Sequence, residues 1–156
     1  GEAGTVIDIT WRNTTLKQRR NNIIIIPNST VASSITTNYN LPKSELSFRV
    51  DCGVSYDSDL EHVERVTVEV AQDVMKTVKG AVTTHKPFVR YSAFGDSSIN
   101  FYVNLRVLDF GKQFRVRHEF IKRLFKRYNE EGIVIPFPIR TLDIPKDSKM
   151  IINKSE

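Results

Sequence analysis

The hydrophobic pattern of this 156-residue chain is typical of strands in its first part and mixes strands with helices afterwards. The strongest signal in the first part is a run of four isoleucines: Ile23, Ile24, Ile25 and Ile26. A short β-branched run bounded by turn-forming residues predicts a strand that is covered on both faces. Pro27 and Asn28 follow it. Because proline lacks a backbone donor and asparagine forms turns, we expect the strand to end there.

Two more strands are expected before this run. Ile7, Ile9 and Trp11 share one face of the first strand, and residues 14–20 form the second. Asn21 and Asn22 join this second strand to the isoleucine run. Asparagine tolerates the positive φ angles of a tight hairpin turn. Three or four short strands in ~40 residues bury little surface alone, and units this small usually need a partner. We therefore expect a small all-β unit that packs in an oligomer.

The rest of the chain alternates between strand and helix. Ser58 and Glu61 form a capping box, and the apolar stripe of helical spacing that follows predicts a helix ending before Gly80. Strict alternation over residues 98–108 predicts a half-exposed strand. A turn joins this strand to an earlier strand, which is expected at about residues 88–93.

The last helix is predicted at about residues 112–131, because Gly132 suits the position just after a helix end. Six residues at helical spacing are predicted to form its apolar face: Phe114, His118, Ile121, Leu124, Phe125 and Tyr128. A short strand at residues 133–135 completes the order βαββαβ, a sheet under two helices. The sequence thus predicts an α+β fold whose second unit is ferredoxin-like.

These patterns divide the chain into a β domain at residues 1–42, an α/β domain at 43–138, and a C-terminal strand with its tail at 139–156. The segment that is predicted to form this last strand is Arg140, Thr141, Leu142, Asp143 and Ile144. It has no evident partner within the chain. We therefore expect it to pair with copies of itself.

The net charge of +5 and a pI near 9.4 allow an anionic partner. Much of the excess positive charge lies on the last predicted helix, between residues 112 and 127. These basic residues lie mostly off the apolar stripe, acidic residues are near them, and no aromatic platform for single strands accompanies them. A solvated face is therefore the favoured interpretation, and nucleic-acid binding is not expected.

No group of side chains predicts catalysis, a metal site or a cofactor. The three histidines are far apart and lack the paired spacing of a metal site. Asp57 and Asp59 fit the positive start of a helix better than an acid/base pair. Cys52, the only cysteine, lies in an alternating apolar run that is typical of a core residue. We expect neither an enzyme nor a bound cofactor.

No segment has the ~20 apolar residues that cross a bilayer, and the start of the chain lacks the basic and apolar regions of a signal peptide. The chain also lacks an initiator methionine and opens directly into a strand-like pattern. We therefore expect a soluble piece of a longer protein.

Several segments, in order and at compatible spacing, resemble the cytoplasmic part of small-conductance mechanosensitive channels, the MscS-like family. They are residues 4–6, 23–29, 38–39, 53–59, 97–101 and 131–138. The resemblance extends over about residues 3–145. It implies an Sm-like β domain followed by a ferredoxin-like α/β domain, with the transmembrane helices of the same parent chain directly before them.

The resemblance also implies an assembly and a function. The family forms a homoheptamer, a hollow cage with side portals at the cytoplasmic face of the inner (plasma) membrane, and residues 140–144 would each add a strand to a barrel at its base. Under membrane tension after hypoosmotic shock, the channel releases ions and small osmolytes. Two alternatives stay open: a free-standing Sm-like ring that binds RNA, and an adaptor ring without a channel.

Overall fold

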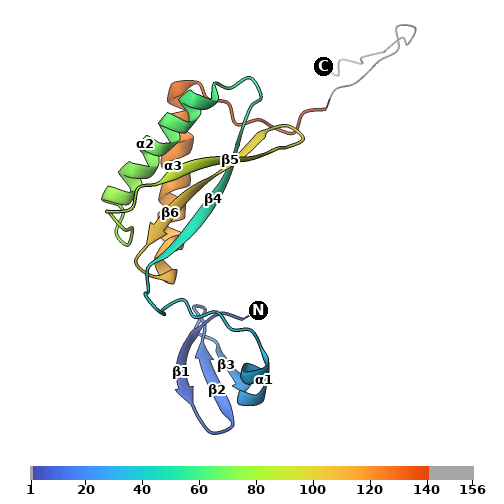
Figure 1. Ribbon diagram of the computed structural model, residues 1–156, viewed down its shortest axis with the longest axis vertical. Helices are drawn as coiled ribbons and strands as arrows, with labels where there is room; N and C mark the ends of the chain where they lie inside the picture. The colour runs from blue at the N-terminus through green and yellow to red at the C-terminus, as the bar shows by residue number, and fades with distance from the viewer. Residues whose placement is uncertain (1, 141–156) are drawn as a thin grey trace, which may run out of the picture. The chain divides into compact units, whose positions relative to one another are not determined.

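The computed structural model describes residues 2–140 (Figure 1). The chain divides into two compact units, Gly1–Leu41 and Pro42–Glu156. This division lies next to the predicted boundary between residues 42 and 43. Each unit is described by itself below.

Unit 1 contains an antiparallel sheet in the order β1-β2-β3, followed by a short helix. Its elements are β1 (Thr5–Ile9), β2 (Asn13–Lys17), β3 (Ile23–Pro27) and α1 (Asn28–Ser33). The helix was not expected, because the sequence here shows only strand and turn signals. Pro27 ends β3 with φ −57° and ψ 137°, an extended conformation that also suits the residue before a helix. The predicted end of the isoleucine strand is thus confirmed, and a helix begins directly after it.

The loop between β2 and β3 contains the predicted asparagine turn. Asn21 has a positive φ of 69°, and asparagine tolerates this left-handed conformation better than most residues. Gln18 N donates to Asn22 O at 2.9 Å, and Asn21 N donates to Gln18 O at 3.0 Å. The turn is therefore confirmed at Asn21, but β2 ends at Lys17 and not at residue 20.

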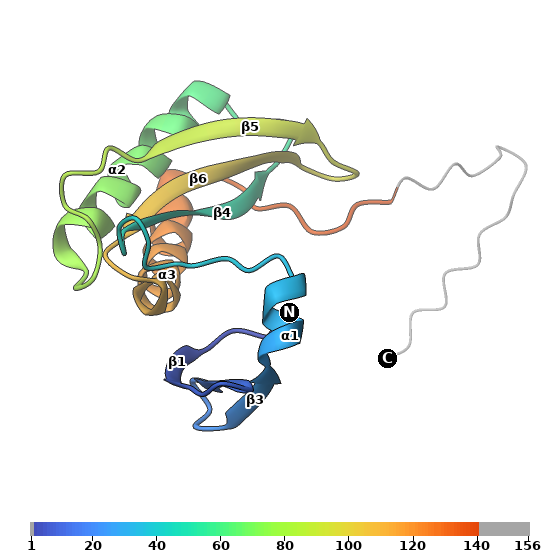
Figure 2. The same ribbon diagram turned by 60° about the horizontal axis from the view of Figure 1, so that its bottom comes forward.

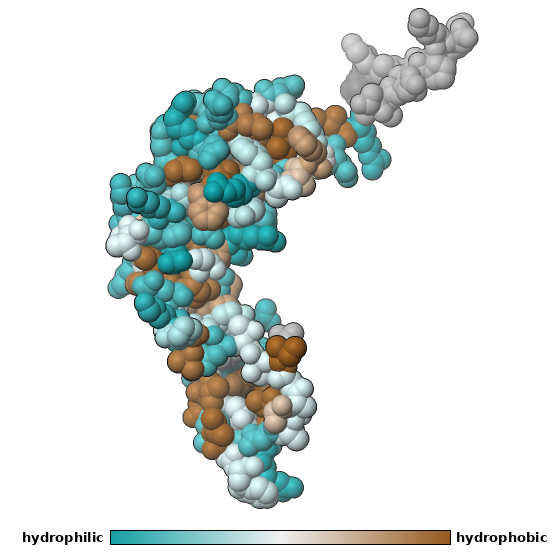
Figure 3. Space-filling model, in the orientation of Figure 1, coloured by the Kyte–Doolittle hydropathy of each residue, from teal (hydrophilic) through white to brown (hydrophobic). Residues whose placement is uncertain are grey.

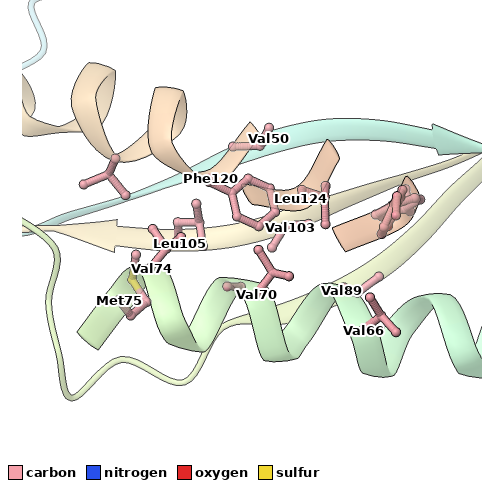
Figure 4. Close-up of a cluster of buried hydrophobic side chains, with 14 of the residues drawn as sticks. Val50, Val66, Val70, Val74, Met75, Val89, Val103, Leu105, Phe120 and Leu124 are labelled. Atoms are coloured by element: carbon pink, nitrogen blue, oxygen red, sulfur yellow. The ribbon is translucent and has the colours of Figure 1, made fainter. Parts of the chain in front are cut away.

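Unit 2 is a sheet in the order β4-β6-β5 with both long helices on one of its faces (Figure 2). Its elements are β4 (Leu46–Val54), α2 (Leu60–Thr77), β5 (Phe88–Phe94), β6 (Ile99–Val107), the 3-10 turn η1 (Phe110–Lys112) and α3 (Gln113–Glu131). Along β6, alternate residues are buried from Ile99 to Val107, which confirms the predicted half-exposed strand. The buried side chains form one core between this face of the sheet and the helices (Figure 4).

The start of α2 differs from the predicted capping box by one residue. Asp59, not Ser58, is the N-cap: its Oδ1 accepts from Glu61 N at 3.0 Å and from His62 N at 3.2 Å. A carboxylate at this place satisfies two free helix donors and also meets the positive end of the helix dipole. The helix ends at Thr77, before Gly80 as predicted.

The predicted strand at residues 133–135 is wrong. Residues 133–140 form no ladder with the sheet, and the single backbone bond from Ser55 N to Val134 O, 3.0 Å long, joins this segment to the chain beyond β4. Pro136 and Pro138 carry no N–H, so a continuous ladder cannot extend through them. Within residues 42–140 the order is therefore βαββα, and the sheet has three strands.

The apolar face of α3 was predicted only in part. The helix buries a series at i, i+4 spacing: Val116, Phe120, Leu124 and Tyr128. Leu124 and Tyr128 were expected, whereas Phe114, Ile121 and Phe125 are exposed. Two apolar stripes lie side by side on this helix. The stripe that packs on the sheet includes Val116 and Phe120, which the helical periodicity of the sequence did not select.

A buried hydrogen bond joins the two helices at the end of the core. Tyr128 Oη lies 2.5 Å from Thr67 Oγ1, and Thr67 Oγ1 donates to Val63 O at 2.6 Å. Because the threonine hydroxyl has one hydrogen and has already donated it, Tyr128 is the donor of the shorter bond. Burial raises the pKa of the Tyr128 phenol further above its usual value, so the phenol stays protonated.

We expect Tyr128→Phe to lower the free energy of unfolding by about 1–2 kcal/mol, because Thr67 Oγ1 would remain buried with its acceptor site unmet. Chemical denaturation monitored by circular dichroism measures the change. The double variant Tyr128→Phe/Thr67→Val removes both partners and should recover part of the loss. A single variant as stable as the original chain would contradict this role.

Candidate assembly surface

The isoleucine strand is not buried within the chain, contrary to the sequence prediction. Ile24 and Ile26 are half-buried, whereas Ile23 and Ile25 are 52% and 63% exposed. Among the described residues of unit 1, the six-residue helix α1 is the one helix, and it packs against β3 and β2. Such a short helix can cover only part of a sheet. The other face of β3 stays open to solvent.

β3 is also an edge strand of its sheet. The order β1-β2-β3 leaves one side of β3 without a neighbouring strand in unit 1. An apolar edge strand is a common site of pairing with another chain. Ile23 and Ile25 therefore lie where a second molecule could cover both their side chains and the strand edge.

Asn28 holds this edge in place. Its backbone N donates to Arg12 O at 2.8 Å, its Nδ2 donates to Thr10 O at 2.9 Å, and Thr14 Oγ1 donates to its Oδ1 at 2.9 Å. These three bonds fasten the start of α1 to the turn between β1 and β2 and to β2 itself. Pro27 and Asn28 therefore end the strand, as predicted, and also join it to a helix.

Further apolar side chains of unit 1 are exposed to solvent. They appear as brown areas on its surface in Figure 3. Those on or next to the sheet are Val6, Ile7, Ile9, Trp11, Ile23 and Ile25. They come from β1, from the turn between β1 and β2, where Trp11 lies, and from β3. The guanidinium of Arg12 lies 4.8 Å from the Trp11 ring centre. Sequence reasoning selected the isoleucines but expected them to be buried, and it did not identify Val6 as exposed.

The predicted C-terminal strand falls almost entirely outside the described residues. Arg140 is exposed and belongs to no strand. Thr141, Leu142, Asp143 and Ile144 lie beyond residue 140, where the structure describes nothing. The predicted pairing of this segment therefore stays a prediction.

Several titratable side chains have identifiable local partners or surroundings. Burial, followed by the nearby Asp51 carboxylate, raises the pKa of the Cys52 thiol to about 12, so the thiol stays protonated at neutral pH and is a poor nucleophile. Asp59 caps α2. No group of three potential metal ligands lies together within residues 2–140. His62 instead lies 3.5 Å from Glu131, and His85 Nε2 lies 3.3 Å from Asn104 O.

Two arginines of the basic helix α3 pair with acidic residues of α2. Arg123 Nη1 lies 2.6 Å from Asp73 Oδ2, and Arg127 Nη2 lies 3.2 Å from Glu69 Oε2. Arg127 also meets Glu131 at 2.8 Å. These pairs place carboxylates beside the arginine charges to which a phosphate backbone would have to bind.

Two small units with open apolar side chains define a class of protein that completes its packing against other chains. In the part of the chain that the structure describes, no helix is both long and apolar enough to cross a bilayer. Comparison with known families gives two matches. Residues 1–41 match the family model described as "Mechanosensitive ion channel, beta-domain", and residues 48–135 match "Mechanosensitive ion channel MscS, C-terminal".

The chain belongs to the MscS family of mechanosensitive ion channels. It is 31% identical over 139 residues to a small-conductance mechanosensitive channel of Helicobacter pylori (strain UM084), an alignment that covers 88% of this chain and 48% of the relative. The crystal structure of Helicobacter pylori MscS in the closed state is similar with a TM-score of 0.77 and 28% identity, over 92% of this chain and 55% of that chain.

A more distant likeness shows the fold alone. The cryo-EM structure of wild-type Arabidopsis thaliana MSL1 has a TM-score of 0.64 and 17% identity, over 86% of this chain and 47% of that chain. The chain spans about half the length of the curated relatives it matches. The resemblance noted in the sequence is thus confirmed at the level of the family.

Proposed function

We propose that this chain is the cytoplasmic cage portion of a channel that opens under membrane tension and releases ions and small osmolytes during hypoosmotic shock. The observation that carries the proposal is the pair of family matches, which follow one another in order and together account for residues 1–41 and 48–135. In this proposal, transmembrane helices of the same protein form the pore, and the chain lies at the cytoplasmic face of the inner membrane.

The proposed assembly is a homoheptamer in which unit 1 is an Sm-like β domain and unit 2 a ferredoxin-like domain. The open face and edge of β3, with Ile23 and Ile25 exposed, support contacts around a ring. The ring would bury these side chains, which unit 1 leaves in water. Unit 2 departs from the full ferredoxin-like order because residues 133–135 form no strand.

We propose a structural role and not a catalytic one for this chain. The raised pKa of Cys52 and the capping role of Asp59 account for two of its reactive groups. The acidic partners of Arg123 and Arg127 disfavour a nucleic-acid surface. Solutes would pass through the portals without a bond being made or broken.

Osmotic downshock of cells that lack their own mechanosensitive channels tests the proposal. Producing the protein in the form its own cell makes should raise the surviving fraction after transfer from high to low osmolarity. A variant with Ile25→Asp serves as the assembly-deficient control. Survival no better than that of empty cells, with the protein present in the membrane, would contradict the proposal. Salt-dependent binding of RNA would instead favour the Sm-like alternative.

The proposed basal barrel predicts an effect of the C-terminal segment. Deleting residues 139–156 should weaken the oligomer, because the segment Arg140–Ile144 would supply one strand per subunit to the barrel. Native mass spectrometry over a dilution series measures the change as earlier dissociation. Equal mass distributions with and without the segment would contradict the proposed barrel.

A further inference from the structure

Helix α3 carries a second apolar face that its own unit does not bury. We call this face the α3 stripe and define it as Phe114, Ile121 and Phe125. All three are exposed, and their spacing places them on one side of the helix. Phe110 packs edge-on against Phe114, with ring centres 6.0 Å apart. The stripe is beside, and distinct from, the row that packs on the sheet.

Positive charge borders the stripe. At 100° per residue, Arg115 and Lys122 lie along the same side of it. Both side chains are exposed. Lys122 has one long contact, 3.9 Å, to Glu119, and Arg115 forms no ion pair with any residue between 2 and 140. The α3 stripe therefore combines an apolar centre with a cationic border.

A second apolar surface lies where two loops of unit 2 meet the segment after α3. We call it the tip patch and define it as Tyr56, Phe94 and Phe137. Phe94 and Phe137 are 82% and 86% exposed. The rings of Tyr56 and Phe94 stack with centres 6.2 Å apart. Figure 3 shows apolar surface beside the end of the described chain.

Hydrogen bonds hold the three parts of the tip patch together. Tyr56 Oη donates to Gly95 O at 2.6 Å, which ties the loop after β4 to the β5–β6 turn. Ile139 N donates to Ser97 Oγ at 3.0 Å, which ties the segment after α3 to the same turn. The exposed aromatic rings thus belong to segments that hydrogen bonds hold in place.

Negative charge borders the tip patch. Asp57 lies next to Tyr56, and Asp96 lies in the turn that follows Phe94. Both carboxylates are exposed, and neither forms an ion pair within the described part of the chain. Arg140, at the end of the same segment as Phe137, offsets part of this charge. The tip patch is therefore complementary to the α3 stripe, with an apolar centre and a mainly anionic border.

We propose that the α3 stripe of one copy of this chain docks on the tip patch of the next copy. Because the two surfaces differ, the contact is head-to-tail, the type that forms a ring when the rotation between neighbouring copies closes. An apolar centre with a charged border is the usual anatomy of a specific interface. Pairing of two α3 stripes would instead bring Arg115 and Lys122 near like charges, which is unfavourable. The inference rests on the proposed ring and names its contact in unit 2.

Photo-crosslinking tests the contact in the protein as its own cell makes it. A photoreactive phenylalanine analogue at position 125 should yield crosslinked dimers, and mass spectrometry should map the crosslink to peptides that contain Phe94 or Phe137. The same analogue at Lys76, an exposed residue of α2, is the matched control and should not reach these peptides. A crosslink from position 125 to a second α3, to unit 1 or to a different protein would overturn the proposal, as would no crosslink.

Charge exchange adds a second test. Lys122→Glu should raise the concentration at which the ring dissociates by about tenfold, because the charge is reversed at every contact. Adding Asp96→Lys should restore much of the loss, whereas Lys76→Glu, an exposed lysine on α2, should change little. No effect of Lys122→Glu, or no rescue, would contradict the contact. If the unaltered ring is intact, only this contact fails; if the unaltered protein forms no ring, the proposed assembly fails as well.

Discussion

Ile25→Asp should abolish the oligomer while leaving the fold of unit 1 nearly intact. The side chain is 63% exposed within the chain, so a carboxylate there remains in water in the single molecule. In the assembled ring the same position would be covered, and an unpaired charge in an apolar interface costs several kcal/mol. The structure thus separates the two effects: the variant should lose assembly and keep its thermal transition as a monomer.

Native mass spectrometry and circular dichroism together measure this prediction in the protein as its own cell makes it. Ile35→Asp is the matched control, because Ile35 is another exposed isoleucine of unit 1 and lies outside β3. The control should keep the mass distribution of the original protein. An Ile25→Asp variant that assembles as well as the control would remove β3 from the interface.

Phe120→Ala should destabilise unit 2 by about 3–5 kcal/mol, because the ring is fully buried between α3 and the sheet and its removal leaves a cavity. Phe125→Ala, five residues further along the same helix, should cost less than about 1 kcal/mol in the monomer, since its side chain is 58% exposed. The two variants delete the same atoms from the two apolar stripes of one helix.

Urea denaturation of the monomeric chain distinguishes these stripes directly. The expected result is a large fall in the transition midpoint for Phe120→Ala and a small one for Phe125→Ala. Similar midpoints for the two variants, or the reverse order, would show that the face of α3 assigned to the core is wrong. The effect of Phe125→Ala on assembly, by contrast, belongs to the head-to-tail contact proposed above.

Elements with local signals were predicted well. The alternation along β6, the C′ position of Gly132 after α3 and the positive φ of Asn21 each depend on residues close together in sequence. The cap of α2 was displaced by one residue because both Ser58 and Asp59 can accept the same helix donors. Local chemistry restricts the N-cap to a few neighbouring residues, but it does not decide which of them caps the helix.

The errors concern contacts between distant residues. Periodicity on α3 allows two stripes, and only the sheet selects the one that contains Phe120. The isoleucine run indicates an apolar strand, but whether Ile25 is covered depends on what packs against it. The segment at 133–135 has strand composition, yet Pro136 and Pro138 deny it a continuing ladder. The exposed apolar surface of unit 1 can be identified only from the folded structure.

Electrical recording from stretched membrane patches tests the central claim most directly. Patches from cells that lack their own mechanosensitive channels, but make this protein in its natural form, should show a current that appears as suction is applied and disappears when it is released. Ile25→Asp should abolish that current. Patches that contain the unaltered protein and carry no tension-activated current would contradict the assignment of this chain to a mechanosensitive channel that opens under tension.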